Sequence, residues 1–228
     1  MMKYDVVIRC KNELAELPRV LSSLQNQIHR PRKIIFVDNG STDGSLEFAT
    51  KAGCQIVPYG LEKFNYSRAL NLGMACVESP AALLLSAHCP LIGESAVERL
   101  IEAMDLFGAA GVFGRQIPTR ESNPLDIRDL LTVFGRERIV YESYPFFHNA
   151  FALIKTDSWK TVQFCETING IEDRFWAREQ CKRGLKIVYE PSAVVYHKHG
   201  LNQTQSQDRA RRICEVLKIL HDDDIVDF

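Results

Sequence analysis

The sequence predicts an α/β protein with a mostly parallel central sheet flanked by helices. In the first half of the chain, short apolar runs of strand length alternate with segments in which apolar residues recur at helical spacing. This alternation is typical of βαβ units, in which helices connect parallel strands. Three polar clusters follow three of the expected strands, at residues 9–13, 38–43 and 86–89. Because ligands of open α/β sheets bind beyond the carboxyl ends of the strands, these clusters predict a single ligand site.

The elements of the first half follow in regular order. Residues 6–9 are the first expected strand, and the helix after it is marked by apolar residues at positions 14, 17, 20, 21 and 24. Residues 34–37 are the second strand, and the turn-forming sequence DNGSTDG at 38–44 offers N-caps for the next helix. The remaining expected elements are a strand at 55–57, a helix at 66–76 capped by Asn65, a strand at 82–85 and a helix around 96–104.

The second half is less regular. Residues 117–144 are rich in charge and are expected to form a mobile loop region with one helix near 126–134. The other expected elements are strands at 111–114, 147–154, 187–189 and 193–197, and helices at 172–183, ended by Gly184, and at 208–220. The chain contains neither an internal repeat nor a linker-like stretch, which predicts one domain over residues 1–228.

Composition excludes several classes of protein. Of 228 residues, 46% are hydrophobic and 25% are charged, and the net charge of −1 leaves no basic excess of the kind that nucleic-acid binders show. No apolar run approaches the ~18 residues that span a bilayer. The chain enters an apolar strand almost at its start, without a signal-peptide layout, so a cytoplasmic protein is expected.

The cysteine spacing and the absence of common nucleotide-binding and hydrolase motifs exclude further classes of protein. The seven cysteines are odd in number and none form a C-x-x-C pair, which argues against a structural zinc site and against a disulfide framework. The sequence has no P-loop and no G-x-S-x-G elbow. Glycines 108, 111 and 114 follow an expected helix rather than a first strand, so they do not make a dinucleotide fingerprint.

An ordered set of motifs resembles family 2 inverting glycosyltransferases of the GT-A fold. The first half carries VVIRCKNE at 6–13, SLQNQ at 23–27 and IIFVDNGSTDGS at 34–45. The second half carries HNAFALI at 148–154, GIED at 170–173 with Trp176 one turn later, and YHKH at 196–199. The resemblance covers roughly residues 3–200 and implies a nucleotide-binding half over about 1–90 and an acceptor-binding half over about 91–228.

The resemblance implies transfer of a sugar from a nucleoside-diphosphate donor. A carboxylate at a strand end can accept the imide N–H of uracil or thymine, and Asp38 is so placed, with Glu13 and Asp43 beside the same crevice. UDP is the expected nucleotide, followed by dTDP and GDP. The expected nucleotide-binding residues are Arg9, Glu13, Asp38, Asn39, Asp43, Arg68 and Ser86. On these residues alone, 38–43 is better explained as a helix-capping turn, and the other motifs in register reverse that preference.

The chain departs from the family pattern at the metal site. Family members commonly have Asp-x-Asp after the fourth strand, and here the matching residues are Ser86-Ala87-His88. His88 would then replace the metal-binding carboxylate, with His197 or His199 as a second ligand. Imidazole suits Mn²⁺ better than Mg²⁺, so Mn²⁺ is the expected ion. The alternative is that no metal is needed and that Arg9, Arg68 or Arg115 neutralises the diphosphate.

Glu172 and Asp173 are the candidate catalytic pair. Inverting transfer needs a carboxylate that removes the proton of the acceptor hydroxyl, and the family pattern assigns this role to the second member, Asp173. Acidic residues at a helix start can equally serve stability alone. Four further residues are expected to contact the donor or acceptor sugar: Arg115, His148, Asn149 and Trp176.

The resemblance also implies a class of acceptor, and two alternative functions are considered beside it. Glycan or lipid-linked acceptors are usual for the family, which leaves open a peripheral contact with the inner face of a membrane. A nucleotidyltransferase would open with a Gly-rich loop, and residues 8–20 contain no glycine. A non-catalytic nucleotide-sugar-binding protein would have no use for the carboxylates at 172 and 173.

Overall fold

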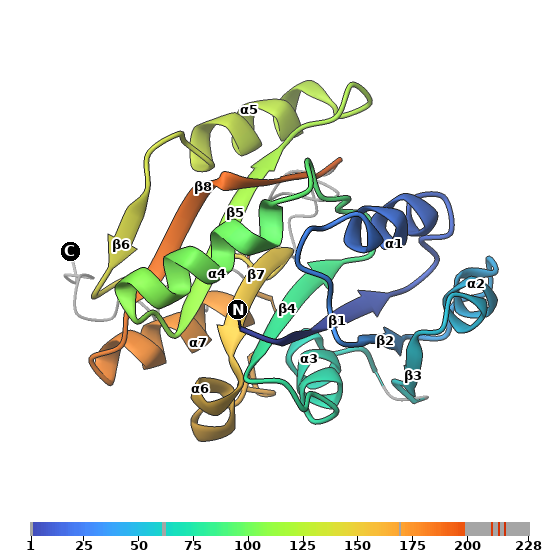
Figure 1. Cartoon of the computed structure of the whole chain (residues 1–228), viewed down its shortest axis with the longest axis horizontal. Coiled ribbons are helices and arrows are strands. Elements are labelled where there is room, and N and C mark those ends of the chain that lie inside the picture. Colours follow the sequence, from blue (N-terminus) through green and yellow to red (C-terminus); the bar gives the residue numbers. More distant parts are fainter. Residues whose placement is uncertain are drawn as a thin grey trace.

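A computed structural model describes residues 2–60, 63–168 and 170–198, and the helical residues 211, 214 and 217. In this part of the chain, one eight-stranded sheet has the order β3-β2-β1-β4-β7-β5-β8-β6 and is flanked by helices on both faces (Figure 1). The α/β class with a mostly parallel sheet is therefore confirmed. Most of the helix expected at 208–220, and the candidate ligand His199, lie outside the described residues.

The first half forms the regular parallel part of the sheet. Strands β1 to β4 run in the same direction, with β1 in the middle between β2 and β4. These strands are β1 (Tyr4–Cys10), β2 (Ile34–Asp38), β3 (Gln55–Pro58) and β4 (Ala81–Ser86). The helices between them are α1 (Leu17–Gln25), α2 (Ser45–Lys51) and α3 (Tyr66–Met74). The expected cap of α3 is confirmed, because the Asn65 side chain accepts a hydrogen bond from the Arg68 N–H.

The second half adds mixed strands to this sheet. β7 lies antiparallel between β4 and β5, β8 is parallel to β5, and β6 pairs antiparallel with β8. The strands are β5 (Gly111–Ile117), β6 (Ile139–Tyr141), β7 (Phe151–Lys155) and β8 (Ile187–Tyr196). The helices are α4 (Ala96–Phe107), α5 (Pro124–Val133), α6 (Thr156–Thr161) and α7 (Glu172–Lys182).

Three expectations for this half were wrong. Residues 117–144 are not a loop region with one helix, because they contain both α5 and the edge strand β6. The expected strand at 147–154 starts only at Phe151, and its first residues form the loop that reaches the site. The strands expected at 187–189 and 193–197 are one strand, β8, whose pairing with β5 shifts register between Gly114 and Arg115. Helix α6 was not expected.

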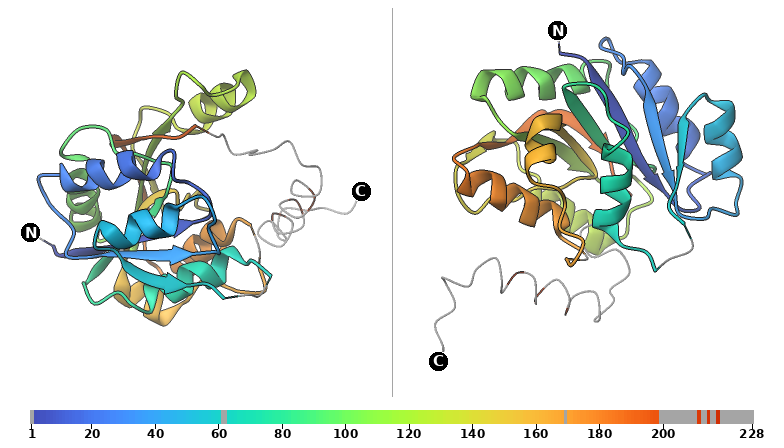
Figure 2. Two further views of the ribbon diagram at one scale, coloured as in Figure 1. Left: turned by 90° about the vertical axis from the view of Figure 1, so that its right-hand side faces the viewer. Right: turned by 90° about the horizontal axis from the view of Figure 1, so that it is seen from below.

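Two apolar layers hold the sheet between its helices. α1, α2 and α4 pack on one face, while α3, α5, α6 and α7 pack on the other (Figure 2). Strand side chains alternate between the layers, so that Val6 and Ile8 face one layer and Val7 faces the other. α3 sits unusually close to β1, because a Cβ atom at Gly73 would lie 2.4 Å from the Val7 side chain. This close approach positions the N-terminus of α3 beside the end of β1. None of the helices in the described residues has the length and apolar character of a membrane span.

Candidate active site

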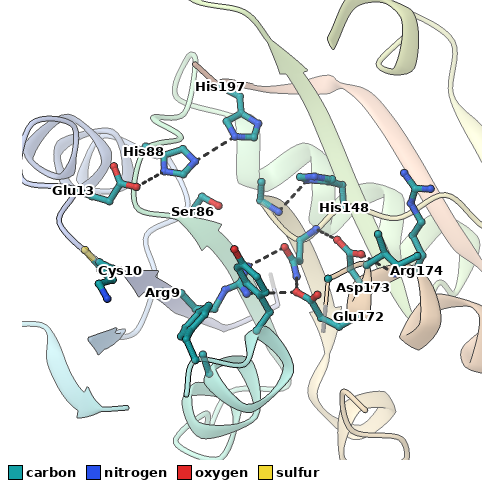
Figure 3. A pocket seen from close by; sticks show the side chains of 18 of the residues that line it. Arg9, Cys10, Glu13, Ser86, His88, His148, Glu172, Asp173, Arg174 and His197 are labelled. Atoms are coloured by element: carbon teal, nitrogen blue, oxygen red, sulfur yellow. Dashed lines mark hydrogen bonds and ion pairs between the residues drawn. The ribbon is translucent and has the colours of Figure 1, made fainter. Parts of the chain in front are cut away.

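A cavity of about 760 Å³ opens at the carboxyl ends of β1 and β4 (Figure 3). Residues from the first half line one side, and the loop before β7, the start of α7 and helix α5 line the other. The cavity therefore lies where the topology of the parallel strands places it. It brings together ten of the predicted site residues: Arg9, Glu13, Asn39, Ser86, His88, His148, Asn149, Glu172, Asp173 and His197.

Arg9 connects the two halves of the site. This residue lies on β1, and its guanidinium is 3.4 Å from Glu172 at the start of α7. It also donates a 3.1 Å hydrogen bond to the side-chain oxygen of Asn149, whose amide nitrogen donates to the same Glu172 oxygen at 2.9 Å. The Tyr66 ring lies against Arg9, 5.2 Å from the guanidinium carbon. The carboxylate of Glu172 is thus paired with a charge and hydrogen-bonded, as a buried carboxylate must be.

Asp173 is hydrogen-bonded by backbone groups, and the charge of Arg174 acts on it without a side-chain hydrogen bond. Its two carboxylate oxygens accept hydrogen bonds from the backbone N–H groups of Asn149, at 3.1 Å, and Arg174, at 2.8 Å. Burial raises the pKa of Asp173 above its ordinary value, and burial, followed by the charge of Asp173, raises the pKa of Glu172. Both side chains are nearly inaccessible to solvent, yet both line the cavity. The pair therefore combines fixed geometry with a raised proton affinity.

The backbone directly before Glu172 and Asp173 is strained. Ile171, directly before α7, has a φ of 65°, and Gly170 before it has a φ of 97°. A β-branched residue in the left-handed region costs on the order of 1–3 kcal/mol and persists where the surroundings enforce it. The turn aims the first two side chains of α7 into the cavity (Figure 3).

A chain of hydrogen bonds links both ends of the cavity through three histidines. His88 Nδ1 lies 2.9 Å from a Glu13 carboxylate oxygen, and His88 Nε2 lies 3.2 Å from His197 Nε2. His197 Nδ1 is 2.6 Å from the side-chain oxygen of Gln116, whose amide nitrogen lies 2.9 Å from His148 Nδ1. These successive contacts fix the orientation of each imidazole ring.

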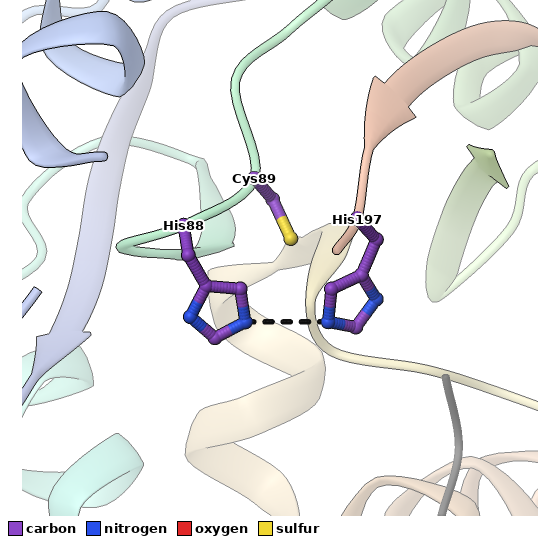
Figure 4. A group of neighbouring side chains, drawn as sticks. All are labelled: His88, Cys89 and His197. Carbon is purple, nitrogen blue, oxygen red and sulfur yellow. Dashed lines mark hydrogen bonds between the residues drawn. The ribbon is translucent and has the colours of Figure 1, made fainter. Parts of the chain in front are cut away.

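His88 and His197 also form a candidate metal site with Cys89 (Figure 4). One ligand atom from each residue lies within 4.8 Å of the other two. Two nitrogen ligands of one transition-metal ion lie roughly 3 Å apart, which matches the 3.2 Å between the facing Nε2 atoms. Burial, and then the charge of Glu13, raises the pKa of the Cys89 thiol well above its ordinary value. A protonated thiol is a poor ligand, so the imidazoles are the residues that fit a metal ion.

Asp38 and Asp43 use their carboxylates to shape the loop after β2. Asp38 is almost fully buried and accepts hydrogen bonds from the backbone N–H groups of Gly40, at 2.9 Å, and Ser41, at 3.1 Å. Asp43 accepts the Leu14 N–H at 2.9 Å and both the N–H and hydroxyl of Ser45. Neither aspartate is among the residues that line the cavity. In this structure both tie the loop down, as the capping-turn alternative expected.

Three further site predictions need correction. Trp176 is fully buried and donates its indole N–H to the Val162 carbonyl, so it belongs to the core and cannot stack on a sugar. Arg115 is outside the cavity lining and donates to the Phe134 carbonyl at 3.3 Å. Arg68 is also outside the lining, with its guanidinium over the Tyr59 ring. Each side chain follows the packing of its own element away from the cavity.

Sequence reasoning missed several residues of the site. Gln116, fully buried on β5, joins His197 to His148, and its only signal was a polar residue in an apolar strand. Tyr66 and Arg174 line the cavity, as does α5 with Arg128, Asp129, Thr132 and Val133. The helix was expected, but no periodicity in the sequence shows which face of it meets a cavity.

Comparisons with known proteins identify the family. Residues 5–162 match the family model described as glycosyl transferase family 2. The chain is 26% identical over 220 residues to the O-antigen chain rhamnosyltransferase RfbN of Salmonella typhimurium, covering 91% of this chain and 70% of that protein. It is 26% identical over 198 residues to the O-antigen chain rhamnosyltransferase WbaN of Salmonella anatum, covering 82% of this chain and 63% of the relative.

Solved structures support the fold. The mannosyltransferase PcManGT of Pyrobaculum calidifontis, in complex with GDP-Man and Mn²⁺, aligns with a TM-score of 0.71 at 18% identity, covering 96% of this chain and 63% of that chain. S. aureus TarS, residues 1–349, aligns with a TM-score of 0.69 at 15% identity, covering 99% and 67%. The sheet, the cavity at its edge and the match over residues 5–162 lead to one assignment: the chain belongs to glycosyl transferase family 2 and has the GT-A fold.

Proposed function

We propose that this glycosyltransferase moves a sugar from a nucleoside-diphosphate donor to an acceptor hydroxyl in a single displacement that inverts the anomeric carbon. The observation that carries the proposal is the buried pair Glu172 and Asp173, which lies across the cavity from the loop after β1. A single displacement needs a base and a bound leaving group, and no covalent intermediate. The cysteines of the site are accordingly not nucleophiles in this proposal.

Asp173 is the proposed base. Its carboxylate is fixed by two backbone N–H groups, which leave its remaining lone pairs for a proton from the acceptor hydroxyl. Glu172 is the less suitable base because Arg9 neutralises it and Asn149 donates to it. Burial raises the pKa of Asp173, and a base with a higher pKa takes a proton more readily once it is ionised.

The donor nucleotide is proposed to bind on the side formed by the ends of β1 and β2. Glu13 and Asn39 line the cavity there, and Asp38 holds the loop that carries Asn39. UDP is the first choice, followed by dTDP and GDP. Neighbours in fold include complexes with GDP-Man and with UDP-GlcNAc, so the fold itself does not choose among the nucleotides.

A divalent metal is proposed to assist at His88 and His197, since the two imidazoles fit a transition ion. Such an ion, when bound, neutralises charge on the donor diphosphate. Nitrogen ligands favour Mn²⁺ over Mg²⁺. Neighbours in fold that were crystallised with Mn²⁺ support a divalent metal, without indicating which residues hold it.

The acceptor is proposed to be a glycan or a lipid-linked glycan. The two curated relatives are named as O-antigen chain rhamnosyltransferases, which makes a nucleotide-activated rhamnose one donor to test. The proposed place of action is the cytoplasm, with the acceptor at the inner face of a membrane.

A binding and hydrolysis panel tests the proposal. UDP, dTDP and GDP are titrated by calorimetry with Mn²⁺ and with EDTA, and nucleotide-activated sugars are then assayed for release of free nucleotide. Tight binding of one nucleotide and slow release from its sugar conjugate, lost in Asp173→Asn, is the expected result. Binding without any release in the presence of acceptor preparations would support the non-catalytic alternative.

A further inference from the structure

The cavity contains a guanidinium for which the described part of the chain supplies no hydrogen-bond acceptor. Arg174 follows Asp173 in the first turn of α7 and lines the cavity. Its backbone N–H binds the Asp173 carboxylate, but its side chain makes no hydrogen bond or ion pair with any described residue. Its guanidinium carbon lies 4.4 Å from the centre of the Phe146 ring. Figure 3 shows Arg174 at the opposite end of the cavity from Glu13 and Cys10.

At this guanidinium the effect of burial outweighs the opposing charge of the nearby Asp173. Burial lowers the pKa of Arg174, because the guanidinium has lost part of its hydration. The Phe146 ring packs against the guanidinium but offers no oxygen or nitrogen acceptor to its N–H groups. A partly desolvated cation that lacks an acceptor is stabilised strongly when an anion completes its hydrogen bonds.

The neighbouring arginines of the cavity are already occupied. Arg9 is bound to Glu172 and Asn149, and Arg128 on α5 is 2.7 Å from Asp129. The oxygens of Asp173 accept backbone N–H groups. Arg174 therefore remains the cation beside the proposed base whose side-chain donors are not used by the described residues.

We propose that Arg174 binds an anionic group of the acceptor, a phosphate, diphosphate or carboxylate, and so places the acceptor hydroxyl beside Asp173. The planar fork of N–H groups matches the paired oxygens of such groups. The contact with the Phe146 ring restricts the Arg174 side chain, which reduces the entropy lost on binding. This inference rests on the proposed glycosyl transfer, and it adds that the acceptor is acidic.

The test is calorimetric binding of anions to the enzyme saturated with UDP, so that the donor side of the cavity is filled. Geranyl diphosphate, glycerol 3-phosphate and glucuronate are titrated, with glycerol as the uncharged control. We expect at least one anion to bind, and Arg174→Gln to weaken it about ten- to a hundredfold, as loss of charged hydrogen bonds does. The tightest of the three then identifies a lipid diphosphate, a phosphomonoester or an acidic sugar as the source.

Arg178→Gln is the matched control. Arg178 is one helical turn further along α7 and also lies over an aromatic ring, that of Tyr144, but it does not line the cavity. We expect it to bind the anion like the wild-type enzyme, while Arg174→Lys retains part of the affinity. Circular dichroism and UDP affinity confirm that Arg174→Gln is folded.

Two results would overturn the role of Arg174: no anion binding by the wild-type enzyme, or equal loss in Arg174→Gln and Arg178→Gln. If the proposal of UDP as donor nucleotide is wrong, the wild-type enzyme will not bind UDP, which is distinct from both of these results. The same comparison of variants without nucleotide still decides the role of Arg174 in that case.

Discussion

Arg9 and Glu172 are 163 residues apart in the sequence, yet their side chains meet at 3.4 Å inside the cavity. Arg9 extends from the central strand β1, and Glu172 opens helix α7. Asn149 joins the pair, because it receives a hydrogen bond from Arg9 and donates one to Glu172. This contact joins the proposed donor side of the site to the carboxylate pair that contains the proposed base.

Asp173→Asn should lose turnover while it keeps donor binding. Removal of a general base typically costs about 10²–10⁴-fold in rate. Glu172→Gln should lose less, because its amide oxygen can still accept from Arg9 and Asn149. Turnover is measured as nucleotide release, and UDP affinity is the control for folding. An active Asp173→Asn with a dead Glu172→Gln would exchange the two roles, and activity in both would place the base elsewhere.

Activity should fall as the pH is lowered. The fall should begin at a higher pH than it would if the base were an exposed aspartate. The base must be ionised to accept a proton, and burial raises its pKa, so protonation sets in earlier as the pH falls. The charge of Arg9 lowers the pKa of both carboxyls, so Arg9→Gln should move this acid limb to higher pH. The measurement is the pH profile of kcat, with Arg68→Gln as the control outside the cavity. If the acid limb of Arg9→Gln stays at the wild-type pH, the limb does not report the ionisation of the buried carboxyl pair.

Mn²⁺ should tighten UDP binding, and His88→Ala should abolish that gain. His88→Asp should shift the preference toward Mg²⁺, since carboxylate oxygen suits the harder ion. Cys89→Ala is the control, because its protonated thiol is not expected to ligate and the Mn²⁺ effect should persist. Calorimetry with each metal and with EDTA measures the effect. Full activity in EDTA would instead assign His88 to direct hydrogen bonding with phosphate.

Asp38→Ala should weaken nucleotide binding by roughly 1.5–3 kcal/mol if the carboxylate also accepts a buried hydrogen bond from the base. The same substitution releases the N–H groups of Gly40 and Ser41, so loop order contributes to the loss. Asp43→Ala separates these effects. Asp43 holds the same loop but is exposed, so its loss should affect UDP binding through loop order alone. Equal UDP affinity in the folded Asp38→Ala variant and the wild-type enzyme would remove Asp38 from nucleotide recognition.

Gly73→Ala should destabilise the fold by about 1–3 kcal/mol, the usual cost of an overpacked contact. The new methyl group would lie 2.4 Å from the Val7 side chain and 3.0 Å from Val37, so α3 must move away from the sheet. The expected gain in helix propensity, up to about 1 kcal/mol, does not offset this. Thermal unfolding measures the effect, and Gly135→Ala, with no heavy atom within 4 Å of the added Cβ, is the control. A stability equal to that of the wild-type protein would show that α3 adapts freely.

The chemical motifs of the site were predictable because they are local in sequence. The apolar run of β1, the turn after β2 and the carboxylates that open α7 each carry their own signal within a few residues. The topology of parallel strands then predicts that these segments meet at one edge of the sheet. The α/β class, most helices of the first half and the meeting of Arg9, Glu13 and His88 at one cavity followed from such signals.

Other features depend on long-range packing, which no short segment specifies. Trp176 is one turn beyond Asp173, but the tilt of α7 turns its ring into the core against Phe147 and Phe164. Gln116 faces two histidines because β5 pairs with both β7 and β8, and Arg174 lies in the cavity against Phe146, a residue 28 positions earlier in the chain. The sequence by itself determined which chemical groups this glycosyltransferase has and in which elements they lie. Tertiary structure decided which groups share the cavity, because the direction of a side chain depends on how its element packs against others distant in the chain.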